Sequence, residues 1–171
     1  MEKSGKVFLT LHTTHHTTTY TMANFYGEYR AKVDDKGRIV FPSAFKSLFD
    51  TDSDLRFVVK KSLFFPCLEM YTHAEWVSSS EGVRSKLNMF NKEHAVLWRE
   101  FMRDTATVVP DGKVGRILIP KNLLEKVGIA SGIDVVFFGA DNRIEIWPKD
   151  LFEAQKLSDD EFTALAEKIL G

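Results

Sequence analysis

The sequence lacks the cysteines of disulfide-bonded and zinc-binding proteins and the long apolar runs of membrane and exported proteins. Cys67 is the one cysteine in 171 residues, so no intramolecular disulfide can form, and no Cys and His spacing resembles a structural zinc site. No apolar run reaches the 18 residues of a membrane span or forms a signal-peptide core. We therefore expect a cytoplasmic protein that is neither inserted into a membrane nor exported, with no metal and no cofactor.

Neither sign of charge is in excess. Lys and Arg number 23 against 24 Asp and Glu, which gives a formal net charge of -1. Any binding to nucleic acid must therefore be local, because the molecule as a whole has no positive field. The chain also lacks a phosphate-binding glycine loop, a zinc-helix motif and a serine elbow. The sequence predicts no enzyme and no small-molecule substrate.

The most informative feature that is present is an internal repeat. Residues 37–42 (GRIVFP) match residues 115–120 (GRILIP), and residues 68–71 (LEMY) match residues 144–147 (IEIW) in the same order at nearly the same offset. Each copy predicts a strand, a Gly-Arg turn, a strand, a proline, a short helix and two more strands. In the first copy, the strand from Gly27, the turn at residues 34–37 and the strand from Arg38 predict a β-hairpin.

Each repeat holds only about 45 residues, too few for a stable domain without a disulfide, a metal or a partner. We therefore expect an α+β protein in which the two halves pair around a pseudo-two-fold axis, with both Gly-Arg turns on one side. The predicted organisation is a disordered leader (1–22), a first module (27–76), a helical connector (77–104), a second module (105–152) and a C-terminal helix (153–171). The apolar face of that last helix needs a cover from its own chain or from a neighbour.

The turns carry the residues suited to a double-stranded DNA partner. Arg38, directly after the permissive Gly37, can grip a phosphate or read guanine O6 and N7, while Lys36 suits a phosphate. We predict that Asp34 fixes the turn by accepting backbone N–H bonds and holds Arg38 in position. The predicted surface is completed by Arg30 and Lys32 on the preceding strand and by Lys113, Gly115 and Arg116 in the second turn.

Each of these features also has a plainer interpretation. A single Asp-x-x-Gly-Arg turn usually carries a solvated surface arginine, and only its duplication, multiplied in an oligomer, favours avid DNA binding. Glu69 and Glu145 occupy matching places on the final strands, where alternation predicts the outward side of a strand rather than paired catalytic carboxylates. Cys67, beside Pro66, is interpreted as a small buried hydrophobe.

The segments 33–42 (VDDKGRIVFP) and 111–120 (DGKVGRILIP) resemble the two turns of the MraZ family. This resemblance implies tandem SpoVT/AbrB-like swapped-hairpin β-barrel modules that form a pseudo-dimer within one chain. It also implies a bacterial, nucleoid-associated transcriptional regulator that forms ring-like homo-oligomers and binds short repeated boxes upstream of the division and cell-wall gene cluster. An antitoxin-like DNA-binding module and a purely structural oligomer are the alternatives.

The second turn departs from the family pattern. The family places an Asp four residues before the Arg, as Asp34 stands to Arg38, whereas Gly112 occupies that position here and Asp111 lies five residues before Arg116. Either this turn is wound differently and Asp111 still accepts backbone N–H bonds, or the second half is chiefly structural.

Overall fold

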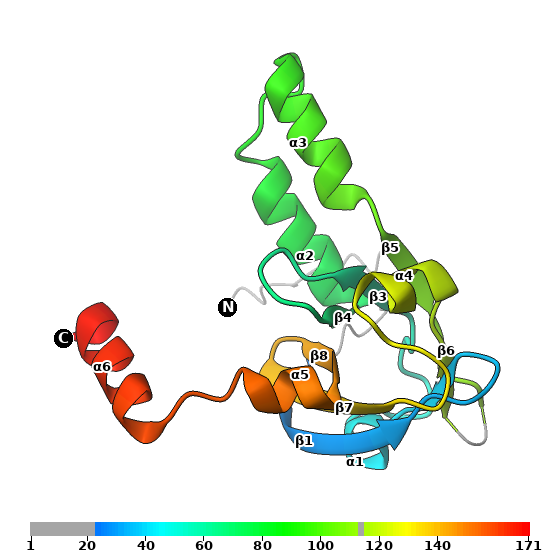
Figure 1. Cartoon of the computed structure of the whole chain (residues 1–171). Helices are drawn as coiled ribbons and strands as arrows, with labels where there is room; N and C mark the ends of the chain where they lie inside the picture. The colour runs from blue at the N-terminus through cyan, green and yellow to red at the C-terminus, as the bar shows by residue number, and fades with distance from the viewer. Residues whose placement is uncertain (1–22, 113–114) are drawn as a thin grey trace, which may run out of the picture.

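The computed structural model describes residues 23–112 and 115–171, so the predicted leader and Lys113 lie outside the described residues. The elements are arranged as two sheets with surrounding helices (Figure 1). In chain order they are β1 (Phe25–Lys32), β2 (Arg38–Val40), α1 (Ser43–Lys46), β3 (Phe57–Lys61), β4 (Leu68–Thr72), α2 (His73–Arg84), α3 (Lys92–Met102), β5 (Thr105–Val108), β6 (Arg116–Leu118), α4 (Lys121–Lys126), β7 (Asp134–Asp141), β8 (Ile144–Pro148), α5 (Lys149–Ala154) and α6 (Asp159–Leu170).

The strands of the two halves are interleaved. The larger sheet has six antiparallel strands in the order β1-β7-β8-β4-β3-β5, and β2 pairs with β6 in a separate two-stranded sheet. Among the named strands of the described residues, β3 pairs with β4 and β7 with β8 within one half, whereas β1–β7, β4–β8, β3–β5 and β2–β6 join one half to the other. The α+β class, mostly antiparallel sheet with several helices, is therefore confirmed.

The predicted local hairpin of the first half is limited to its turn. The Asp34 N–H donates to the Arg38 carbonyl (2.9 Å) and Val33 bridges to Ile39, but β1 itself pairs along its whole length with β7. The lengths explain this choice, because the three residues of β2 can satisfy only part of an eight-residue strand. The described strands also form no closed barrel, since β1 and β5 are the two free edges of an open sheet.

Both halves contribute to one hydrophobic core. Ile39 of β2 lies opposite Ile117 of β6, and both side chains are fully buried. Phe41 packs against Phe137 of β7, with ring centroids 6.2 Å apart, and so joins residues from different halves. Burying a side chain of this size stabilises the fold by roughly 1.5–3 kcal/mol. The core therefore depends on the two halves folding together.

Glu69 and Glu145 lie opposite each other on β4 and β8 and are largely buried, so the outward, solvent-facing position predicted for them is wrong. They face away from the main core, but aromatic residues from α2, α5 and the 62–67 loop pack over this face of the sheet. Hydrogen bonds from Tyr71 and Trp147, together with Arg143, balance the two carboxylates. Burial also raises the pKa of nearby Cys67 to about 12, consistent with a structural thiol.

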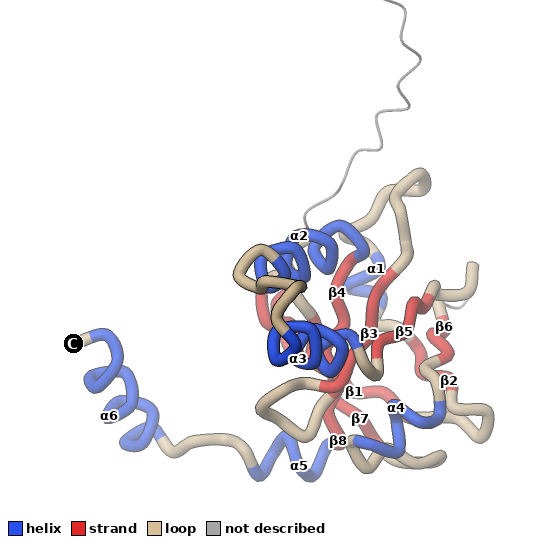
Figure 2. Tube along the Cα trace, turned by 90° about the horizontal axis from the view of Figure 1, so that it is seen from above, coloured by secondary structure: helices blue, strands red, loops and turns tan. Residues whose placement is uncertain are grey.

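Two helical segments extend from the sheet (Figures 1 and 2). The predicted connector is a pair of helices, α2 and α3, held together in part by stacking of Trp76 on Phe101 with centroids 5.7 Å apart. The predicted C-terminal helix is divided into α5 and α6, and the capping box of Ser158 and Glu161 starts α6 as expected. No residue of α6 is buried. None of the helices in the described ranges is long and apolar enough to cross a membrane.

Candidate nucleic-acid interface

The first Gly-Arg turn is organised by one carboxylate. Asp34 Oδ1 accepts hydrogen bonds from the backbone N–H groups of Lys36 (2.9 Å) and Arg38 (2.8 Å), and Asp34 Oδ2 accepts one from Arg38 Nε (2.7 Å). Gly37 has a φ of +78°, a left-handed conformation that favours glycine. The prediction that Asp34 fixes this turn and holds Arg38 is confirmed.

The ion pair with Asp34 leaves the two terminal nitrogens of the Arg38 guanidinium free. The ion pair uses Nε, and no acceptor in residues 23–112 or 115–171 bonds the two terminal nitrogens. The Arg38 side chain is 32% exposed, so its stem is supported while its tip remains accessible. A guanidinium held at Nε loses less conformational freedom when its terminal nitrogens bind a ligand.

The hydrogen bonds to Asp34 make the turn sensitive to acid. The backbone N–H of Arg38 is the main cause that lowers the pKa of Asp34 below its ordinary value of 3.8. Because the native turn favours the ionised carboxylate, its stabilising contribution is complete above that ordinary value and is lost as the pH falls through the lower native pKa. We expect the backbone amide shifts of Lys36 and Arg38 to change with a midpoint below pH 3.8 in an NMR titration.

The control for this titration is Asp34→Asn, which cannot ionise. In that variant the acid-dependent change at the two amides should be absent, although its side-chain oxygen can still accept a backbone hydrogen bond. A wild-type midpoint above 3.8 would contradict the assigned role of the carboxylate.

The second turn is one residue longer but closes in a similar way. Asp111 Oδ1 accepts a hydrogen bond from the backbone N–H of Arg116 (2.9 Å), and the Asp111 N–H donates to the Arg116 carbonyl (2.8 Å). Of the two alternatives for this turn, the structure therefore has the one in which Asp111 still accepts a backbone N–H bond. Within the described residues, however, Asp111 makes no ion pair with Arg116, so the second guanidinium lacks the restraint seen at Arg38.

Each turn is backed by the short helix of the other half. A Cβ added to Gly37 would lie 3.7 Å from Leu124 Cδ1 of α4, and one added to Gly115 would lie 3.4 Å from Lys46 Cδ of α1. Lys46 and Leu124 occupy the same position in the two repeats. Lys46 is a cation beside the second turn that the sequence analysis missed, because the contact joins the two halves of the chain.

The two arginines lie on one face of the two-stranded sheet, which we call the β2–β6 ribbon (residues 38–40 and 116–118). Ile39 and Ile117 face the core, so the residues on either side of them face outward. Arg38 lies opposite Leu118, and Arg116 lies opposite Val40. The two arginines are thus diagonal neighbours, with Cα atoms about 7–8 Å apart. The ribbon and the described parts of both turns lie at the end of the molecule farthest from α6 (Figure 1).

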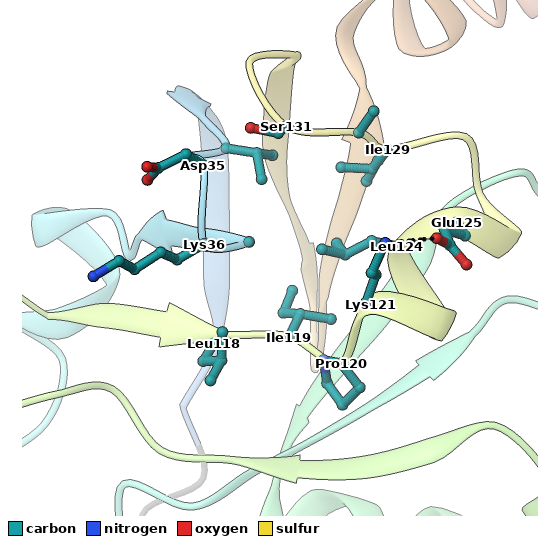
Figure 3. A pocket seen from close by; sticks show the side chains of 13 residues that line it. Asp35, Lys36, Leu118, Ile119, Pro120, Lys121, Leu124, Glu125, Ile129 and Ser131 are labelled. Carbon is teal, nitrogen blue, oxygen red and sulfur yellow. Dashed lines mark ion pairs between the residues drawn. The ribbon is translucent and has the colours of Figure 1, made fainter.

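A pocket of about 570 Å³ lies beside the first turn (Figure 3). Its floor is apolar and includes Ile119, Leu124 and Ile129, and Asp35 and Lys36 of the turn form one wall. Lys36 extends away from the pocket in Figure 3, whereas Lys121, on the opposite side, forms an ion pair with Glu125 at 3.6 Å. Of the two lysines, Lys36 is therefore the one that keeps a free charge among the described residues.

Arg30 and Lys32 are not brought to the ribbon. They lie on β1 in the six-stranded sheet, where Arg30 pairs with Glu153 at 3.6 Å and Lys32 pairs with Asp134 at 3.7 Å. Arg30 also lines a second pocket, with Phe138 and Phe152, away from the two turns. Their assignment to the DNA-binding surface stays a prediction.

The chain is similar to a set of bacterial proteins that share one name. The matching relatives are named transcriptional regulators, a non-enzymatic class, in agreement with the expectation from the sequence. The chain is 37% identical over 150 residues to the transcriptional regulator MraZ of Bacteroides thetaiotaomicron, covering 88% of this chain and 94% of that relative.

Two further relatives named transcriptional regulator MraZ are each 40% identical to this chain. The protein of Christiangramia forsetii matches over 88% of this chain and 95% of its own length, and that of Cytophaga hutchinsonii over 88% and 97%. A family model described as "MraZ protein, putative antitoxin-like" matches residues 101–170. The chain belongs to the MraZ family.

Proposed function

We propose that this chain is a sequence-specific regulator that binds double-stranded DNA with the outward face of the β2–β6 ribbon and its two flanking turns. The observation that carries the proposal is the pair of diagonal arginines on that face, Arg38 and Arg116, whose terminal nitrogens have no acceptor within the described ranges. Arg38 and Arg116 read bases, Lys36 and Lys113 contact phosphates, and Asp34, Gly37 and Gly115 shape the turns.

The local charge supports this assignment despite the net charge of -1. Lys36, Lys46 and Arg116 lie at or beside the two turns, and none of them has an ion pair in the described part of the chain. Arg30 and Lys32, by contrast, each lie beside a carboxylate, Glu153 at 3.6 Å and Asp134 at 3.7 Å. Free cations are thus present where the ribbon meets solvent, and such cations bind phosphates by releasing counterions.

The proposed regulator acts in the cytoplasm, on the nucleoid, as a homo-oligomeric ring that engages repeated short boxes upstream of the division and cell-wall gene cluster. One ribbon offers few contacts, and linking several in one assembly raises avidity through effective concentration. Exposed apolar residues of α6 support an assembly, because Phe162 is 64% and Ile169 is 70% exposed in the single chain.

Selection of bound sequences from a random DNA pool tests the proposal. We expect enrichment of short boxes that recur at a fixed spacing, since a symmetric assembly presents its ribbons at regular intervals. An Arg38→Ala protein, selected in parallel at the same salt concentration, should enrich the boxes more weakly. A pool that shows no enrichment with the wild-type protein contradicts the proposal.

The antitoxin-like alternative uses the same DNA-binding surface with a C-terminal segment that neutralises a toxin. α6 argues against it, because this segment is helical with its own capping box, whereas antitoxin tails are usually disordered until bound. Copurification of the chain with a small toxin from its own host would favour the alternative. A purely structural oligomer would show no DNA binding.

A further inference from the structure

We infer that the DNA-binding face reads thymine as well as guanine, through contacts of Val40 and Leu118 with thymine 5-methyl groups in the major groove. This inference rests on the proposed function and deepens it by assigning two specificity residues that are neither charged nor polar. It begins with the outward face of the ribbon, where two aliphatic side chains face solvent beside the two arginines.

Within the ribbon, the exposed aliphatic side chains are confined to the outward face. Val40 is 49% and Leu118 is 59% exposed, whereas Ile39 and Ile117, between them on the same two strands, are fully buried. The register places Arg38 opposite Leu118 at one end of the ribbon and Val40 opposite Arg116 at the other. Opposed Cβ atoms lie about 4.5–5.5 Å apart, so each end presents one guanidinium and one aliphatic group side by side.

The major groove offers the matching pair of targets. It admits a two-stranded ribbon, exposes O6 and N7 of guanine to an arginine, and exposes the 5-methyl of thymine to an apolar side chain. The minor groove is about 6 Å wide and shows no methyl group, and the phosphate backbone has no apolar partner. A ribbon that presents guanidinium and aliphatic groups on one face is therefore complementary to the major groove and not to the minor groove or the phosphate backbone.

The geometry also predicts the arrangement of the bases. The diagonal separation of the two arginines, about 7–8 Å, corresponds to about two base steps of 3.4 Å. Because the pseudo-two-fold axis passes between Ile39 and Ile117, the two ends of the ribbon face opposite strands of the duplex. We therefore expect two G·C pairs about two steps apart, each with an A·T pair beside it and the thymines on opposite strands.

A protein partner fits this face less well. Pairing it with the same face of a second copy would bring four arginines together, and like charges repel. Any other protein would have to supply a carboxylate for each guanidinium, because a buried unpaired charge is costly. Val40 and Leu118 do not form a continuous apolar patch that could bind a protein partner, because Arg38 and Arg116 lie between them.

Replacing thymine by uracil in a selected box tests the inference without altering the protein, because only the 5-methyl group is removed. We expect the wild-type chain to lose affinity by about three- to ten-fold at each contacted thymine in a titration at fixed salt. Val40→Ala or Leu118→Ala should lose a similar amount on thymine DNA and become insensitive to uracil at one position each. Val96→Ala, which alters an exposed valine of α3, should keep the wild-type response.

The possible outcomes distinguish this inference from the proposed DNA-binding function on which it rests. If uracil has no effect while Arg38→Ala still weakens binding to the selected box, the inferred methyl contacts are wrong and the proposed DNA-binding function is retained. If the wild-type chain prefers no sequence at all, both the inference and the proposed function are wrong. If Val40→Ala or Leu118→Ala changes the oligomeric mass in light scattering and leaves uracil sensitivity intact, these residues cover another protein surface, and the inference is overturned.

Discussion

Replacing both Arg38 and Arg116 by alanine is expected to remove sequence preference and leave only weak, salt-sensitive DNA binding. Each bidentate arginine contact to guanine contributes about 1–3 kcal/mol of discrimination, so losing two should weaken binding to a preferred box by about thirty-fold or more. The variant should still fold, because both arginine side chains lie on the outward face of the ribbon, whereas the buried Ile39 and Ile117 lie on its other face.

The two single variants should differ. Arg38 is held at Nε by Asp34, whereas Arg116 has no such restraint in the described residues, so Arg38 is better prepared to bind and Arg38→Ala should cost more. Titrations against a preferred and a scrambled box at two salt concentrations measure these effects. Lys36→Ala should weaken both DNAs equally and reduce the salt slope by about one.

The matched control is Arg99→Ala, because Arg99 is an exposed arginine of α3 for which the described part of the chain provides no ion pair. It should bind both DNAs like the wild-type protein. A double Arg38 and Arg116 variant that still distinguishes the two boxes would contradict the proposed site.

Separating the halves is the second change with a large expected effect. Fragments 23–104 and 105–171 should each be unfolded, since the only strand pairs left to them are β3–β4 and β7–β8. A lone two-stranded hairpin is at best marginally stable in water. Circular dichroism should show little sheet in either fragment, and mixing them should restore it.

A cut in the α2–α3 connection, within residues 85–91, is the informative comparison, because it interrupts no strand and lies outside the core. Its two fragments should reassociate at least as well as those cut at residue 104, which lies next to β5. A folded monomeric fragment from either cut would contradict the view that the halves share one core.

The sequence could predict features that depend on local chemistry. The Asp34 turn follows from the hydrogen-bonding habits of Asp and the conformational freedom of Gly37, and the start of α6 follows from Ser158 and Glu161. The repeat also indicated that the halves would pair. Period-two alternation shows that β1 is half buried but does not identify its partner, which is why the predicted hairpin holds only at its turn and β1 pairs with β7 instead of β2.

Features that depend on contacts between distant segments could not be predicted from local sequence patterns. Glu69 and Glu145 alternate with core residues as solvent-facing residues would, and their burial depends in part on packing between segments far apart in the chain, such as Phe65 on Trp147, 82 residues further on. In the same way, no local pattern marks Lys46 as a neighbour of Gly115, since the contact joins the two halves.

The pairing of β1 with β7 has a consequence during translation. The Tyr26 hydroxyl donates a hydrogen bond to Asp141, 115 residues further along the chain. At about 5–20 residues per second, a ribosome needs roughly 6–23 s to add the 115 residues that separate Tyr26 from Asp141. Charged Glu28, Arg30 and Lys32 at alternate positions of β1 would keep this waiting strand from aggregating with other nascent chains.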